Sequence, residues 1–251
     1  MIQFLKSIVE RLFGCRLYRT SLPRGVDLFD DLERDFGLAE FKMVFDVGAN
    51  VGQSAVEYVR VFPDATIFCF EPVPSVFAEL RSKKAQLPRI STFELGMGAD
   101  EGKADIHVAA DSRISSIPNK RPGDSTQIIS LATVSGFCHA REIRQLDFLR
   151  IDTEGFDLSV LQGAAELLAA GAIHFVQVES APARQTGYFV GFDEVAEYLR
   201  GFGYELYGIY EQTPHWTGRK SLLDFNLVFV SSRLLKEPSF ITSMNAPARS
   251  Q

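Results

Sequence analysis

The sequence predicts an α/β protein whose mostly parallel, seven-stranded sheet ends in an antiparallel hairpin. The first observation is a βαβ pattern, in which apolar runs at residues 43–47 and 66–70 flank a glycine-containing turn and an amphipathic segment. Such runs are typical of strands buried on both faces of a parallel sheet. The second is that strand-like and helix-like segments alternate up to residue 204, as βα units require. The third is the short connection between the last two apolar runs, which favours a hairpin.

The composition indicates a soluble globular protein with one main domain. The chain has 251 residues, of which 46% are hydrophobic and 23% are charged, and its net charge is −6. This charge argues against a nucleic-acid partner, because nucleic-acid binders concentrate positive charge on one face. The cysteines Cys15, Cys69 and Cys138 are odd in number and widely spaced. They indicate neither a disulfide framework nor a zinc site, so a cytoplasmic location is expected.

The amino-terminal segment, residues 1–40, is predicted to be a helical extension. Residues 1–19 have apolar side chains on one helical face, and residues 27–36 predict a second helix. The first helix either docks on the domain or contacts a membrane surface or a second subunit. No run reaches the roughly 18 apolar residues that span a bilayer, and charged residues interrupt any secretory signal. The main domain is assigned to residues 41–235, and residues 236–251 are expected to be disordered.

A ligand site is predicted where the first two strands end. Asp46 and the turn GANVG, residues 48–52, follow the first strand, and Glu71 ends the second. Ligands of open α/β sheets bind at this edge, and an acid there can accept both hydroxyls of a ribose. The turn lacks the G-x-G-x-x-G spacing of a pyrophosphate site, whereas Asp46 beside it suits a ligand that carries a cation. We therefore expect S-adenosylmethionine. The alternatives are a dinucleotide, or carboxylates that merely cap strand ends.

The middle of the chain predicts a helix, a third strand and a long loop. The helix covers residues 75–85 and the strand residues 91–95, after which Met97 in a polar turn is expected near the adenine. Strand-like runs at residues 104–108 and 127–134 flank the loop. A loop of this length is either a lid or disordered, and Ser115 and Ser116 within it are candidate substrate contacts.

A second group of carboxylates follows the fourth strand, residues 148–151. The motif DTEG places Asp152 and Glu154 two residues apart, so both side chains can point to one side. Glu154 is the candidate general base, with Asp152 and Glu179 as supporting carboxylates. The same carboxylates could instead gather Mg²⁺. Asp157 is expected to cap the following helix.

The last elements are a fifth strand, a helix and a terminal hairpin. The fifth strand covers residues 173–178 and is expected to end at Glu179 and Ser180. The hairpin strands are expected at residues 204–210 and 225–230, with the last strand inserted beside the fifth. His215 and Trp216 at the hairpin tip could contact a sugar, or Trp216 could pack back on the sheet.

Separated motifs make the sequence resemble one known family. The runs FDVGANVGQSA, FEPVPSVFAEL, LDFLRIDTEGFDLSVLQGAAELL and VQVES occur in order between about residues 42 and 230. They resemble the FkbM family of S-adenosylmethionine-dependent methyltransferases, although Thr153 stands where that family usually has an aliphatic residue. The resemblance implies the Rossmann-like fold of class I methyltransferases.

The resulting hypothesis is an O-methyltransferase that acts on a small hydroxylated acceptor, such as a sugar, a glycolipid or a polyketide-type metabolite. Alternatives are a nicotinamide-dependent oxidoreductase and a non-catalytic binding module. A homo-oligomer is compatible with the sequence, and no metal ligand is assigned. The residues expected to bind the cofactor are Asp46, Gly48, Asn50, Gly52, Glu71, Pro72 and Met97.

Overall fold

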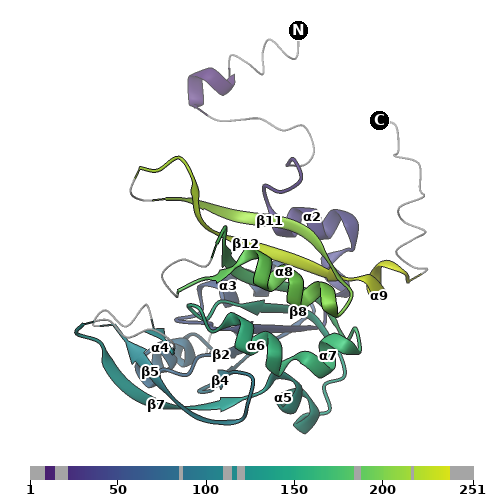
Figure 1. The fold of residues 1–251 in the computed structure, drawn as a ribbon. Helices are drawn as coiled ribbons and strands as arrows, with labels where there is room; N and C mark the ends of the chain where they lie inside the picture. Colours follow the sequence, from purple (N-terminus) through teal and green to yellow (C-terminus); the bar gives the residue numbers. More distant parts are fainter. Residues whose placement is uncertain are drawn as a thin grey trace.

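The fold is organised around one large sheet. The computed structural model describes residues 9–14, 22–84, 87–109, 115–117, 122–183, 188–215 and 218–237. The sheet has the strand order β11-β12-β9-β8-β1-β2-β3, and short β10 pairs with β9 (Figure 1). Its strands are β1 Met43–Val47, β2 Thr66–Phe70, β3 Ile90–Phe93, β8 Leu146–Ile151, β9 Ile173–Ala181, β10 Val190–Gly191, β11 Tyr204–Pro214 and β12 Leu222–Ser231.

The predicted terminal hairpin is confirmed. Strand β12 inserts between β9 and β11 and runs antiparallel to both. All other pairs of this sheet are parallel. The sheet is therefore mostly parallel with one antiparallel strand, as the alternation of segments predicts, and it has the α/β architecture that the family resemblance implies.

Helices cover both faces of the sheet. The helices are α2 Leu28–Asp35, η1 Leu38–Glu40, α3 Gln53–Val61, α4 Pro74–Lys84, α5 Val134–Ala140, α6 Asp157–Gly163, α7 Ala165–Ala169, α8 Phe192–Gly201 and α9 Ser232–Leu235. Helices α5 to α8 pack on the face that carries Phe45 and Leu149. Helices α2, α3 and α4 pack on the face that carries Val44 and Phe148. This alternation along β1 and β8 follows from the two-residue period of a strand.

A second, smaller sheet is present that the sequence did not predict. It has the order β4-β7-β5-β6, from β4 Gly96–Met97, β5 Gly102–Val108, β6 Ser115–Ser116 and β7 Ser125–Ala132. The strand-like runs around the long loop therefore pair with each other, because their apolar residues pack on the start of α4 through Val73 and Val76. The second of these runs begins and ends two residues earlier than expected, since Val134 begins α5.

Two local predictions were wrong. Asp157 does not cap α6, because its carboxylate turns back and accepts hydrogen bonds from the backbone N–H groups of Thr153 and Gly155. The fifth strand does not end at Glu179, because β9 continues to Ala181, with Ser180 pairing with β10 and β12 and Ala181 with β10. The contact of the Asp157 carboxylate with the backbone of Thr153 and Gly155, which the sequence did not predict, holds the loop that borders the site.

Some predictions fall largely outside the described residues. Of the amino-terminal helix, the structure describes residues 9–14, and of the predicted tail it describes residues 236 and 237. Within the described ranges, no helix is both long enough and apolar enough to cross a bilayer. Helix α2, by contrast, belongs to the core, where Leu28 and Leu32 are buried against the sheet.

Candidate active site

A cavity of about 340 Å³ opens at the carboxyl ends of β1, β2 and β8. This volume lies within the range of small-molecule sites, and the position is where open α/β sheets bind ligands. Of the residues predicted to bind a cofactor, those that line it are Gly48, Asn50, Glu71, Pro72 and Met97. Asp46 and Gly52 do not line it. Asp46 lies beneath the floor, and Gly52 packs against the side chain of Leu80.

The floor of the cavity depends on a close backbone contact between two loops. Gly48 has a φ of +83°, and a Cβ built on it would lie 1.8 Å from the carbonyl oxygen of Asp152. The N–H of Asp152 in turn donates to the carbonyl of Val47 at 3.0 Å. Only glycine combines this φ with this lack of a side chain. The first glycine of GANVG therefore joins the end of β1 to the DTEG loop.

Glu71 faces the cavity with its carboxylate held by the backbone. One oxygen accepts from the N–H of Val73 at 2.9 Å and the other from the N–H of Asn50 at 3.1 Å. Each oxygen keeps a further lone pair for a ligand. Burial raises the pKa of Glu71 to about 7, although these two hydrogen bonds oppose the shift. A pair of ligand hydroxyls would therefore find an oriented and poorly hydrated acceptor.

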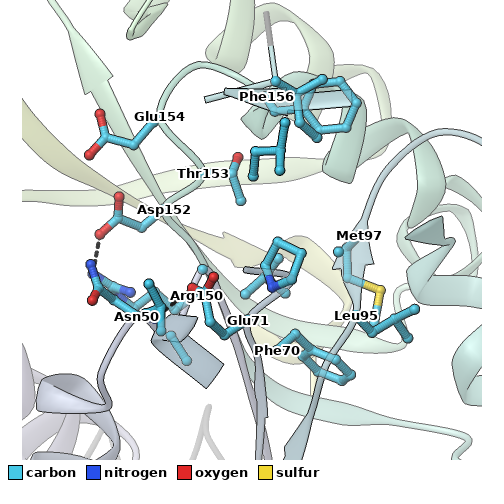
Figure 2. A pocket seen from close by; sticks show the side chains of 18 of the residues that line it. Asn50, Phe70, Glu71, Leu95, Met97, Arg150, Asp152, Thr153, Glu154 and Phe156 are labelled. Carbon is cyan, nitrogen blue, oxygen red and sulfur yellow. Dashed lines mark hydrogen bonds and ion pairs between the residues drawn. The ribbon is translucent and has the colours of Figure 1, made fainter. Parts of the chain in front are cut away.

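The cavity has an apolar side and a polar side. Figure 2 shows Leu95, Met97 and Phe156 on one side, with the carboxylates of Asp152 and Glu154 on the other. Glu71 lies between the two groups. A ligand with a flat apolar base, a central diol and a charged end would match this order of surfaces, and S-adenosylmethionine has those parts.

The DTEG loop holds Glu154 in an uncommon backbone conformation. Glu154 has a φ of +53° and Gly155 a φ of +94°, and such a left-handed conformation costs a residue with a side chain roughly 1–2 kcal/mol. Asp157 accepts from the N–H groups on both sides, at 3.0 Å from Thr153 and 3.1 Å from Gly155. Ser116 Oγ donates to the carbonyl of Glu154 at 2.9 Å. These contacts fix the loop, and strained residues held this way often serve function.

Arg150 is a site residue that the sequence analysis missed. It lines the cavity from β8, and its guanidinium lies 3.0 Å from Asp46 and forms a second, shorter ion pair with Asp152. Asp46 is its register partner on β1 and is fully buried, where it also accepts from Ser54 Oγ. The positive charge that pairs with Asp46 is therefore that of Arg150, and not that of a ligand as the sequence suggested. The signal was an arginine among the apolar residues Phe148, Leu149 and Ile151 of the strand that neighbours Asp46.

Glu179 interacts electrostatically with the other carboxylates from outside the cavity. It does not line the cavity, and burial raises its pKa well above the usual range, with Asp152 and Glu154 adding to the shift. Glu179 therefore keeps its proton near neutral pH. Among the residues that the structure describes, no three His, Cys, Asp or Glu side chains form a group that could hold a metal ion. Asp152, Glu154 and Glu179, which the sequence suggested as Mg²⁺ ligands, therefore do not form such a group.

The residues predicted to contact the acceptor are dispersed. Ser116 is 2% exposed and braces the DTEG loop instead of facing solvent. His215 lies in the hairpin connection, where its N–H donates to the carbonyl of Ser221 and its side chain lines neither this cavity nor a second one described below. Trp216 and the side chain of Ser115 fall outside the described part of the chain.

Comparison with known proteins identifies the family. Residues 46–206 match the methyltransferase FkbM domain, which covers more than half of the chain. The chain belongs to the FkbM methyltransferase family. The matched range holds the glycine turn, Glu71 and the DTEG loop of this FkbM protein, so the resemblance seen in the sequence is confirmed.

Two curated relatives are similar to this FkbM protein at low identity. The 2-O-methyltransferase NoeI of Sinorhizobium fredii is 24% identical over 152 residues, covering 50% of this chain and 58% of the relative. The hexuronic acid methyltransferase AglP of Haloferax volcanii is 25% identical over 140 residues, covering 56% of each chain. The chain thus spans somewhat more than half the length of these relatives.

Solved structures are similar at still lower identity. The magnesium protoporphyrin IX methyltransferase of Synechocystis PCC 6803, with bound S-adenosylmethionine, is 13% identical with a TM-score of 0.47, covering 90% of this chain and 96% of that chain.

Proposed function

We propose that this protein is an S-adenosylmethionine-dependent O-methyltransferase that methylates a hydroxyl group of a small, sugar-containing acceptor. The observation that carries the proposal is the carboxylate of Glu71, oriented by two backbone N–H groups between an apolar and a polar wall of the cavity. Membership of the FkbM family and the curated names 2-O-methyltransferase and hexuronic acid methyltransferase support the reaction and the acceptor class.

The lining residues fit the cofactor part by part. Glu71 would accept the ribose hydroxyls, and Phe70, Leu95 and Met97 would pack against the adenine. The polar end at Asn50 and Asp152 would hold the amino-acid part. When bound, S-adenosylmethionine supplies a methyl group on a positively charged sulfur, which an acceptor oxygen attacks in line. Orientation of this kind contributes up to about 7–11 kcal/mol to catalysis.

Glu154 is proposed as the general base. Its carboxylate lies on the same side of the cavity as that of Asp152 (Figure 2). As the acceptor oxygen gains the methyl group, its proton would pass to Glu154, a transfer that contributes roughly 10²–10⁴-fold. Asp152 is less suited, because it is paired with Arg150. Glu179 would support the site as a protonated neighbour, not as a base.

The free cysteines fit a cytoplasmic enzyme. Cys69 and Cys138 are both buried and unpaired. Because structural disulfides mark oxidising compartments, we place the reaction in the cytoplasm.

Calorimetry with S-adenosylhomocysteine and with NADH tests the proposal. We expect S-adenosylhomocysteine to bind in the micromolar range or tighter and NADH to show no binding. Transfer of labelled methyl from S-adenosylmethionine to sugar glycosides, followed by mass spectrometry, then locates the methylated atom. Tight binding of NADH in place of S-adenosylhomocysteine would favour an oxidoreductase, and binding of neither would favour a non-catalytic module.

A further inference from the structure

A second cavity of about 310 Å³ adjoins the first. The two share Gln53, Ser54 and Arg150, so the second begins on the other side of the Arg150 side chain. The rest of its wall comes from the start of α2, from α3, from β9 and from β11. It lies on the sheet face covered by α2 and α3, next to the polar side of the first cavity.

Gln177 forms part of the inner wall of this second cavity. It is the register partner of Arg150 on β9 and is only 4% exposed. Its side chain lines the cavity, and none of the hydrogen bonds found among the described residues uses its side-chain amide. Its donor and acceptor atoms are therefore suited to a ligand that brings hydroxyl groups.

The outer part of the second cavity is acidic. Asp27 from the cap of α2, Glu57 from α3 and Glu211 from β11 all line it. The pKa of Glu57 is raised by burial first and then by the charges of Glu211 and Asp27, so these carboxylates act on one another. Glu211 also accepts a hydrogen bond from the side-chain amide of Asn226. A ligand with its own carboxylate would meet repulsion from this rim.

We propose that the second cavity is the acceptor subsite, and that it selects an uncharged or amino-bearing sugar over one that carries a carboxylate. The assignment rests on the proposed methyl transfer in the first cavity. Gln177 would bind ring hydroxyls at the inner end, and Asp27, Glu57 and Glu211 would accept hydrogen bonds from hydroxyl or ammonium groups at the rim. The site thereby gains specificity by repelling the wrong charge as well as by binding the right group.

Saturation-transfer NMR titrations of the whole protein, loaded with S-adenosylhomocysteine, test this subsite with three probes. These are methyl glycosides of glucose, glucosamine and glucuronic acid. We expect the first two to bind and the glucuronide to bind at least about tenfold more weakly, a difference typical of specific polar recognition. Equal or tighter binding of the glucuronide, or no binding of any probe, would overturn the proposal.

Three variants assign the effect to the second cavity. Gln177→Leu should weaken glucoside binding about tenfold, as the loss of a buried hydrogen-bonding group does. Glu57→Gln combined with Glu211→Gln should bring glucuronide affinity to within about threefold of glucoside affinity, as removal of like charge predicts. Glu197→Gln, an exposed carboxylate on α8 at the opposite face, is the matched control and should change neither. If the double variant still prefers the glucoside over the glucuronide to the same degree, the carboxylates of Glu57 and Glu211 do not cause the selectivity, and the proposal is refuted.

The failure of this subsite can be distinguished from failure of the proposed function. S-adenosylhomocysteine affinity and melting temperature are measured for every variant. If Gln177→Leu does not fold, the double variant still tests the subsite. If the protein binds no S-adenosylhomocysteine but the sugar selectivity holds without it, the proposed function is wrong, and the second cavity is a selective sugar site but not an acceptor subsite for methyl transfer. If the protein binds S-adenosylhomocysteine but shows no sugar selectivity, only the subsite proposal is wrong.

Discussion

The carbonyl oxygen of Asp152 occupies the place that the side chain of residue 48 would need, 1.8 Å from an ideal Cβ. The end of β1 and the DTEG loop after β8 are therefore in direct backbone contact, and glycine at position 48 is a requirement of that contact. Because Gly48 lines one wall of the cavity and Asp152 another, the shape of the cofactor site depends on the distance between them.

Gly48→Ala should destabilise the protein and weaken S-adenosylhomocysteine binding. The added methyl group would push the DTEG loop away, at a cost beyond the roughly 1–3 kcal/mol of backbone strain alone. Urea unfolding and calorimetry measure both effects. Gly203→Ala is the control, since Gly203 has a similar φ of +79° but open space around it. Equal losses in the two variants would show that backbone strain, and not the contact with Asp152, is responsible.

Cofactor affinity should depend on pH through Glu71. Its folded pKa of about 7 lies above the unfolded value, so the folded protein binds this proton more tightly and loses stability as the pH rises from about 4.5 to 7. The ionised form is the better acceptor for a diol. We expect S-adenosylhomocysteine affinity to increase up to about tenfold per pH unit below 7 and to level off near pH 8. In Glu71→Gln, calorimetry should show a weak affinity that no longer changes over this range.

Glu154→Gln should lower turnover by roughly 10²-fold or more while S-adenosylhomocysteine affinity stays unchanged, because the amide keeps the shape but cannot take a proton. Initial rates over pH 5–9 check this with a glycoside acceptor. The fall in rate on the acidic side of the wild-type profile, where a general base becomes protonated, should disappear in the variant. A loss of only a few-fold with the profile intact would mean that positioning alone carries the reaction.

Arg150→Met should destabilise the fold by about 3–5 kcal/mol, because it leaves the fully buried Asp46 without its cation. Chemical unfolding measures the loss. Adding Asp46→Asn removes the uncompensated charge, so the double variant should recover much of the stability. It should not recover cofactor affinity, since Asp152 would still lack the partner that orients it. Equal stability of the single and double variants would contradict this account.

Removal of divalent metal should leave the activity unchanged. The reason is geometric: in the described part of the chain, Asp152, Glu154 and Glu179 do not form a group that could hold an ion. Methyl transfer measured after EDTA treatment, with and without added Mg²⁺, checks this. Activity lost with EDTA and restored by Mg²⁺ would make Glu154 a metal ligand instead of a base.

Much of the fold could be predicted from the sequence, because buried parallel strands leave unmistakable apolar runs. The order of β1, α3 and β2, and the insertion of β12 beside β9, follow from such runs and from connection length. The second sheet could not be predicted in the same way. Its strands are partly exposed, and their apolar residues pack against Val73 and Val76 at the start of α4, a contact that local sequence patterns do not reveal.

Site residues could be predicted from the sequence where they stand at the end of a predicted strand. They could not be predicted where their role depends on a contact with a residue elsewhere in the chain. Gly48 and Glu71 could be placed from local spacing alone. The pair of Asp46 and Arg150 could not, because it depends on β1 and β8 being neighbours across about a hundred residues of sequence. The role of Asp157 was missed for a similar reason: its carboxylate contacts the preceding loop and not the helix that it begins.

The two cavities have only Gln53, Ser54 and Arg150 in common. The cofactor cavity is built largely from loops at the centre of the sheet, whereas α2 and the edge strand β11 contribute much of the second wall. Edge elements can change length and sequence with little disturbance to a central sheet. A lineage could therefore exchange its acceptor by altering α2 and β11 while inheriting the methyl-donor site intact, and an engineer could follow the same route.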